Sequence, residues 1–182
     1  MITIDELKRL GGFIAYTPVG VIRLAFRKSF MYHFFSDLAP PLLVDNIHTH
    51  PHSFTSSVKK GSIKHDIFQY SESEQETDHC LRSFSYATTG AEIQTRMENI
   101  EFNKVLTFNV TEGNTYYLHY TTMHYVTATN NTVTLLNCDP YIGALKNVDF
   151  IMRKDVVYKE EELKNLKTEK ECWEIVEQVL AA

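Results

Sequence analysis

The chain has 182 residues, of which 43% are hydrophobic and 12% aromatic, enough to bury the core of one domain. Its formal net charge of −5 argues against nucleic-acid or anionic-membrane partners, which require a concentrated basic surface. We find no bilayer-spanning apolar run and no signal-peptide pattern, and Cys80, Cys138 and Cys172 are too scattered for a disulfide framework. We therefore expect a cytoplasmic protein with neither nucleic acid nor membrane as a partner.

The chain opens with a predicted short helix within residues 1–12. Thr3, followed three residues later by Glu6, matches a capping box, and Gly11-Gly12 ends the helix. From residue 13 to about 150 the pattern changes to short segments rich in Val, Ile, Thr, Tyr and Phe, separated by turn residues. The predicted strands are Phe13–Tyr16, Val19–Phe26, Leu42–His50, Phe54–Lys59, Ile63–Tyr70, Glu92–Met97, Val105–Val110, Thr115–Tyr120, Tyr125–Thr129 and Val133–Asn137.

Two other stretches differ from these strands. Residues 71–91 include the acidic, polar run Ser71–Asp78, which predicts an inserted loop. The C-terminal part, residues 159–181, is predicted to be helical, with one piece over Lys159–Asn165 and a second begun by a capping box of Thr168 and Glu171. The apolar stripe of that second helix is typical of an element that covers a core or forms a homodimer. The whole chain is therefore predicted to be one all-β domain with a helix at each end.

The first candidate site is the cluster His48-Thr49-His50-Pro51-His52. Side chains two residues apart on a strand point to the same face, so His48 and His50 would present two imidazoles side by side. That is the arrangement that a metal needs for two adjacent ligands. Such a pair also arises by chance, and strand histidines are often bonded only to backbone carbonyls. His124, in a tyrosine-rich strand segment, is the best candidate for a third ligand.

The spacing around the pair resembles the first motif of the cupin superfamily, G-x5-H-x-H-x(3,4)-E-x6-G. Here the segment reads His48-x-His50-x3-Phe54-x6-Gly61, so the two histidines and the closing glycine are in register. Phe54 stands where the motif has its glutamate, and Leu42 stands where it has its opening glycine.

The second cupin motif, G-x5-P-x-G-x2-H-x3-N, is matched less completely. The segment reads Gly113-x5-His119-x-Thr121-x2-His124-x3-Ala128, which keeps the first glycine and the histidine. The resemblance covers roughly residues 42–138. It implies a double-stranded β-helix, or jelly-roll barrel, with a metal held by His48, His50 and His124.

The absence of the glutamate makes the chain similar to the three-histidine subset of cupins. Three neutral imidazoles leave a metal electrophilic, with open positions, and suit Fe(II), while Zn, Ni, Mn or Cu also bind such ligands. The familiar members of that subset are thiol dioxygenases, in which an arginine upstream binds the substrate carboxylate, and Arg23 lies about there. Arg23 could equally point outward on an alternating strand. The Ser-His-Tyr relay of that family is absent, since the corresponding stretch reads Leu135-Leu136-Asn137-Cys138-Asp139.

Further residues could serve a reaction at such a centre. His119 and His52 could carry protons, because an imidazole titrates near neutrality. Tyr117 and Tyr120 lie on opposite faces of one strand, and the one that lines the pocket could donate a hydrogen bond to a bound oxygen. We take Arg23, Tyr117 and His119 as the catalytic candidates.

The preferred hypothesis is a cupin-type, non-haem iron oxygenase acting on a small polar or anionic molecule. One alternative is a metal-dependent isomerase or lyase of a sugar-like substrate. The other is a non-catalytic jelly-roll module for binding or assembly, because fold does not imply function.

Overall fold

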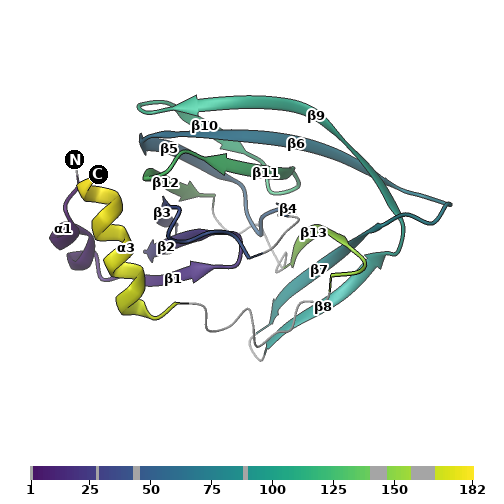
Figure 1. Ribbon diagram of the computed structural model, residues 1–182, viewed down its shortest axis with the longest axis horizontal. Coiled ribbons are helices and arrows are strands. Elements are labelled where there is room, and N and C mark those ends of the chain that lie inside the picture. Colours follow the sequence, from purple (N-terminus) through teal and green to yellow (C-terminus); the bar gives the residue numbers. More distant parts are fainter. Residues whose placement is uncertain (1, 28, 43–45, 88–89, 140–146, 157–166) are drawn as a thin grey trace.

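The computed structural model describes residues 2–27, 29–42, 46–87, 90–139, 147–156 and 167–182, and 55% of it is strand. Two helices and thirteen strands form in these ranges (Figure 1). They are α1 (Ile4–Arg9), β1 (Phe13–Thr17), β2 (Val21–Phe26), β3 (Phe30–Phe35), β4 (Ile47–His48), β5 (Phe54–Lys60), β6 (Ser62–Glu72), β7 (His79–Ala87), β8 (Gly90–Met97), β9 (Ile100–Thr111), β10 (Thr115–Leu118), β11 (Met123–Ala128), β12 (Thr132–Cys138), β13 (Asn147–Arg153) and α3 (Glu169–Ala181).

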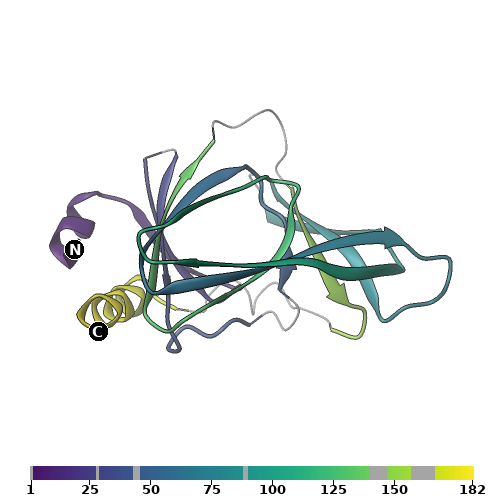
Figure 2. The same cartoon turned by 90° about the horizontal axis from the view of Figure 1, so that it is seen from above.

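The strands form two antiparallel sheets that face each other as a sandwich, one of them curled into a half-barrel (Figure 2). One sheet has the order β1-β2-β3-β12-β5-β10 and the other β8-β7-β13-β4-β11-β6-β9. The predicted all-β fold class with short terminal helices is confirmed.

Eight of the strands follow the nested pairing of a jelly roll. β3 pairs with β12, β4 with β11, β5 with β10 and β6 with β9, all antiparallel. This is the pattern of one long hairpin whose two arms are wound together, with successive pairs alternating between the sheets. The winding places β4 beside β11, although about 75 residues separate them in the chain.

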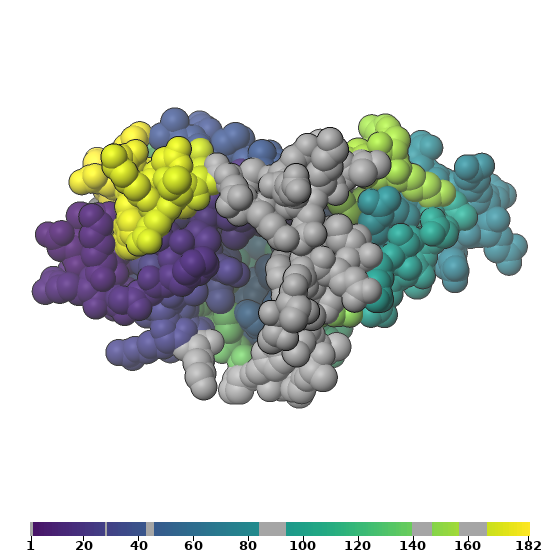
Figure 3. All heavy atoms as spheres, turned by 90° about the horizontal axis from the view of Figure 1, so that it is seen from below, coloured from purple at the N-terminus to yellow at the C-terminus, as the bar shows by residue number. Residues whose placement is uncertain are grey.

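The remaining strands extend the two sheets. β1 and β2 continue one sheet beyond β3, and β13, β7 and β8 continue the other beyond β4. Residues 71–91, predicted to be an inserted loop, instead contain the end of β6, all of β7 and the start of β8. The segment is therefore an insertion between the two arms, but β7 is held in the sheet because it pairs with β13 over seven residues. Figure 3 shows the terminal helices (purple and yellow) and the coloured parts of β7 and β8 (teal) at opposite ends of the molecule.

Three strands were not predicted: β3, β7 and β13. β3 has no polar–apolar alternation because both its faces are covered. Tyr32 and Phe34 lie against the helix-covered core, and Met31 and Phe35 pack against clusters on the other face. Of the predicted strand Leu42–His50, only Ile47–His48 is strand, and residues 43–45 lie outside the described part of the chain.

The terminal helices cover the outer face of the smaller sheet. Both predicted capping boxes are present, at Thr3 with Glu6 and at Thr168 with Glu171. The predicted helical piece at Lys159–Asn165 lies outside the described residues. The helices and the outer face of the sheet share one core cluster, whose buried members are Leu7, Ile14, Ile22, Leu24, Phe34, Ala39, Val133, Cys172, Ile175, Val176 and Val179. In the described ranges, neither helix is long and apolar enough to cross a membrane.

Candidate metal centre

The jelly-roll winding sets His48 directly opposite His124. The two residues are Cα partners on the antiparallel strands β4 and β11. Residues opposite each other on neighbouring strands point to the same face, which here is the face inside the sandwich. His50 follows β4, and its backbone N–H donates to the carbonyl of Tyr120 at 3.2 Å, which keeps this residue beside the approach to β11.

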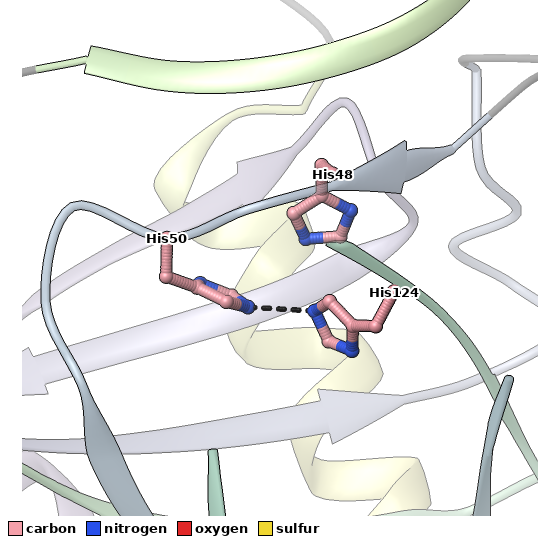
Figure 4. Close-up of side chains that lie close together, drawn as sticks. All are labelled: His48, His50 and His124. Atoms are coloured by element: carbon pink, nitrogen blue, oxygen red, sulfur yellow. Dashed lines mark hydrogen bonds between the residues drawn. The ribbon is translucent and has the colours of Figure 1, made fainter. Parts of the chain in front are cut away.

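The three imidazoles converge on one space (Figure 4). One ligand nitrogen from each of His48, His50 and His124 lies within 4.8 Å of the other two. The Nε2 atoms of His50 and His124 are 2.8 Å apart, and the ring centroids of His48 lie 5.0 Å from His50 and 4.8 Å from His124. The structure therefore brings together all three predicted ligands.

One hydrogen bond orients His48. Its Nδ1 lies 3.0 Å from the backbone carbonyl oxygen of Asn46, which can only accept, so Nδ1 carries the proton. A neutral His48 consequently has its lone pair on Nε2. Stacking against Phe150, with ring centroids 5.5 Å apart, also restricts the ring.

Burial keeps the three imidazoles neutral. Desolvation lowers the pKa of His48 to about 4, and the hydrogen bond to Asn46 only partly opposes it. Desolvation, followed by repulsion from neighbouring histidines, holds the pKa of both His50 and His124 well below the usual value of an imidazole. At neutral pH the site thus presents unprotonated nitrogens, the form that a metal binds.

Phe54 occupies the space next to the site where the cupin motif has a carboxylate. Its ring meets His50 edge-on, with centroids 4.8 Å apart, and only 3% of the residue is exposed. It packs with Leu118, Leu136 and Cys138 in an apolar cluster. Among the described residues, the group that could bind a metal is therefore made of nitrogen donors alone and has an apolar wall.

Arg23 points into the sandwich. Its neighbours on β2, Ile22 and Leu24, belong to the helix-covered core, so Arg23 projects from the opposite face of the strand. It pairs in register with His33 on β3. Burial, and then the charge of Arg23, lowers the pKa of His33 to about 3. Nε of Arg23 is buried and has no hydrogen-bond partner in the part of the chain that the structure describes.

Tyr117 and His119 are placed differently from the three histidines. Tyr117 is 56% exposed, and its hydroxyl donates to Asp139 at 3.2 Å. His119 is also exposed, and its Nδ1 bonds with the hydroxyl of Thr121 at 2.8 Å. His52, half-buried, is outside the group of converging ligand atoms.

Two residues at the site, His65 and Tyr116, were not predicted from the sequence. His65 on β6 lies with its Nδ1 2.9 Å from Nδ1 of His124, and Tyr116 on β10 packs against His65 with ring centroids 4.7 Å apart. The alternation Ile63-x-His65-x-Ile67 was the available signal, because it puts a histidine on the apolar face of a strand.

No protein-family model and no curated protein sequence matches this chain. The assignment of the site therefore depends on its geometry. That geometry is a buried group of three neutral histidines that could bind a metal ion.

Proposed function

We propose that the chain is a cupin-type, metal-dependent enzyme, a non-haem iron oxygenase that acts on a small anionic molecule. The observation that carries the proposal is the convergence of His48, His50 and His124 inside a jelly roll, with nitrogen atoms facing one another and no carboxylate among them. The facing Nε2 atoms of His50 and His124 can share the proton of one neutral imidazole, and a cation bound by both lone pairs would take the place of that proton.

The donor set fits a divalent transition metal. Imidazole nitrogens bind such ions at about 2.0–2.1 Å, so adjacent ligands of one ion stand about 3–3.5 Å apart. The distance of 2.8 Å between Nε2 of His50 and Nε2 of His124 is close to that value. When bound, Fe(II) supplies open coordination positions and redox chemistry toward oxygen. Zn, Ni and Mn are the other candidates, since ligand type alone discriminates weakly among these ions.

The charge of the site favours an anionic substrate. Three neutral histidines add no negative charge, so the full charge of a bound ion would remain. Arg23 adds a second positive charge on the inner face, and its buried Nε lacks a partner among the described residues. A buried guanidinium is stabilised by a carboxylate or a similar anion, with which it forms charge-assisted hydrogen bonds. We therefore assign Arg23 to binding the substrate's anionic group.

Other side chains would handle the remainder of the substrate. Phe54 excludes water from one side of His50. Tyr117 and His119 are exposed, and we keep them as candidates for contacts at the rim of the site, not next to the three nitrogens.

Metal analysis of untagged protein tests the proposal. We expect close to one metal ion per chain, or stoichiometric uptake after anaerobic addition of Fe(II). Less than a small fraction of one ion, with no gain after that addition, would overturn it. Turnover that proceeds without oxygen would instead support a Lewis-acid isomerase or lyase. Ligand binding or assembly that survives joint replacement of His48 and His124 by alanine would support a non-catalytic module.

A further inference from the structure

A fourth buried histidine contacts the three-histidine group. His65 is 1% exposed, and its Nδ1 lies 2.9 Å from Nδ1 of His124. The two ring planes are 15° apart and the ring centroids 5.1 Å apart. With the nitrogens this close, the rings meet edge to edge in nearly one plane, as the in-plane lone pair of an imidazole nitrogen requires. The contact is a well-formed hydrogen bond between two imidazoles.

The surroundings of His65 are otherwise apolar. Its ring is nearly parallel to that of Phe108, with centroids 5.0 Å apart, and it packs against Tyr116. Its Nε2 is buried and has no hydrogen-bond partner within the described ranges. Burying a polar ring is unfavourable unless its nitrogens are bonded, and the adjacent positions on this strand face hold Ile63 and Ile67. The bond to His124 is therefore a polar contact that a histidine makes at this position and that an isoleucine, like its neighbours on this face, could not make.

Proton placement gives this bond a direction. His124 is bonded at both ring nitrogens, to His65 through Nδ1 and to His50 through Nε2. A neutral imidazole has one proton, so it donates at one nitrogen and accepts at the other. If His65 donates, the proton of His124 sits on Nε2 and blocks that nitrogen for a metal. If His65 accepts, the proton sits on Nδ1 and the lone pair of Nε2 faces His48 and His50.

We propose that His65 is a positioning residue of the metal centre, which accepts the Nδ1 hydrogen bond of His124 and so holds His124 in its metal-binding tautomer and orientation. The inference rests on the proposed metal site. Outer partners of this kind fix the ring and the tautomer of a ligand histidine, and their loss typically weakens metal binding about 10–100-fold.

Two substitutions separate this role from simple packing. His65→Phe keeps a ring of similar shape and removes the acceptor, whereas His65→Asn keeps an acceptor close to the position of Nδ1. We expect the dissociation constant for Zn(II), measured by competition with a chelating dye, to rise about 10–100-fold in His65→Phe and much less in His65→Asn. His79→Phe is the matched control, because His79 packs against Phe102 and takes no part in the group, and it should leave the constant unchanged.

A second measurement uses the unmodified chain, so its result does not depend on whether a variant folds. NMR of the histidine ring nitrogens in the Zn(II)-loaded protein should find the proton of His124 on Nδ1 and that of His65 on Nε2. The inference is overturned if His65→Phe binds Zn(II) as tightly as wild type, if both His65 variants lose affinity equally, or if NMR finds His65 protonated on Nδ1. Failure of the wild-type chain to bind any metal overturns the proposed function instead, and is seen before any variant is compared.

Discussion

His48 and His124 face each other across the β4–β11 pair, with ring centroids 4.8 Å apart. The proposed metal site therefore depends on the register between two strands that come from different arms of the jelly roll. A shift of one residue would turn one imidazole to the opposite face of the sheet.

Replacing His124 by alanine should abolish the metal centre. The variant removes one of three ligands. Zn(II) affinity should therefore fall more than about 100-fold, the upper end of the range for loss of a residue that only supports a ligand. In thermal unfolding, the stabilisation that saturating Zn(II) gives to the wild type should disappear, because a ligand stabilises only the state that binds it. His79→Ala is the control and should keep the Zn(II) shift. An unchanged shift in His124→Ala would show that the metal binds elsewhere.

Phe54→Glu tests the missing carboxylate. The Phe54 ring already touches His50 edge-on, so a carboxylate there would lie within reach of a metal held by the three histidines. We expect tighter Zn(II) binding, together with a metal-free protein less stable by about 3 kcal/mol or more, because an apolar cluster member is lost and a charge is buried. Titration with Zn(II) and urea unfolding measure the two effects. Affinity equal to or below that of wild type would contradict the expected geometry.

The metal-free protein should lose stability as the pH falls from about 7 to about 4. Burial lowers the pKa of His33 to about 3 and the pKa of His48 and His65 to about 4, against 6.5 for an unperturbed imidazole. Between these values the unfolded chain binds protons that the folded chain does not, so the free energy of unfolding rises with pH. Each such histidine contributes a slope of up to roughly 1.4 kcal/mol per pH unit.

Urea unfolding at several pH values checks this slope. The stability that the neutral histidines give to the folded protein is fully present above the pKa that they have in the unfolded chain, and it declines below that pKa. The plot of unfolding free energy against pH should therefore flatten above about pH 7. His33→Phe should reduce the slope. A free energy of unfolding that is independent of pH between about 7 and about 5 would contradict the buried, neutral state of these histidines.

Gly61→Ala should destabilise the β5–β6 turn. Gly61 has φ of +77°, and a Cβ there would lie 2.4 Å from the hydroxyl oxygen of the buried Thr132. Gly113, with φ of +85° and open space around it, is the matched control. Both substitutions introduce backbone strain, but only the first introduces the clash. We expect Gly61→Ala to cost about 1–3 kcal/mol more than Gly113→Ala in urea unfolding. Equal costs would contradict the close approach of Thr132.

Local features of the chain were sufficient to predict part of the structure. The capping boxes at Thr3 and Thr168 begin helices because they involve residues three apart in sequence. Alternation in segments such as Phe54–Lys59 predicted strands with one inner face, and β5 forms there over Phe54–Lys60. The resemblance to the two cupin motifs also predicted His48, His50 and His124 as a set, and the structure brings their nitrogens together.

Contacts between distant segments could not be predicted in this way. β7 is a strand because β13 pairs with it, and β3 shows no alternation because both its faces are covered. From the sequence, Arg23 could point to either face of its strand. The packing of Ile22 and Leu24 against the terminal helices puts Arg23 on the inner face. The resemblance to the cupin motifs thus singled out three of the histidines in the sequence, and the pairing of β4 with β11 brings them together because His48 and His124 are Cα partners. The fourth, His65, was decided only by the tertiary structure, because its bond to His124 exists only once β6 lies beside β11.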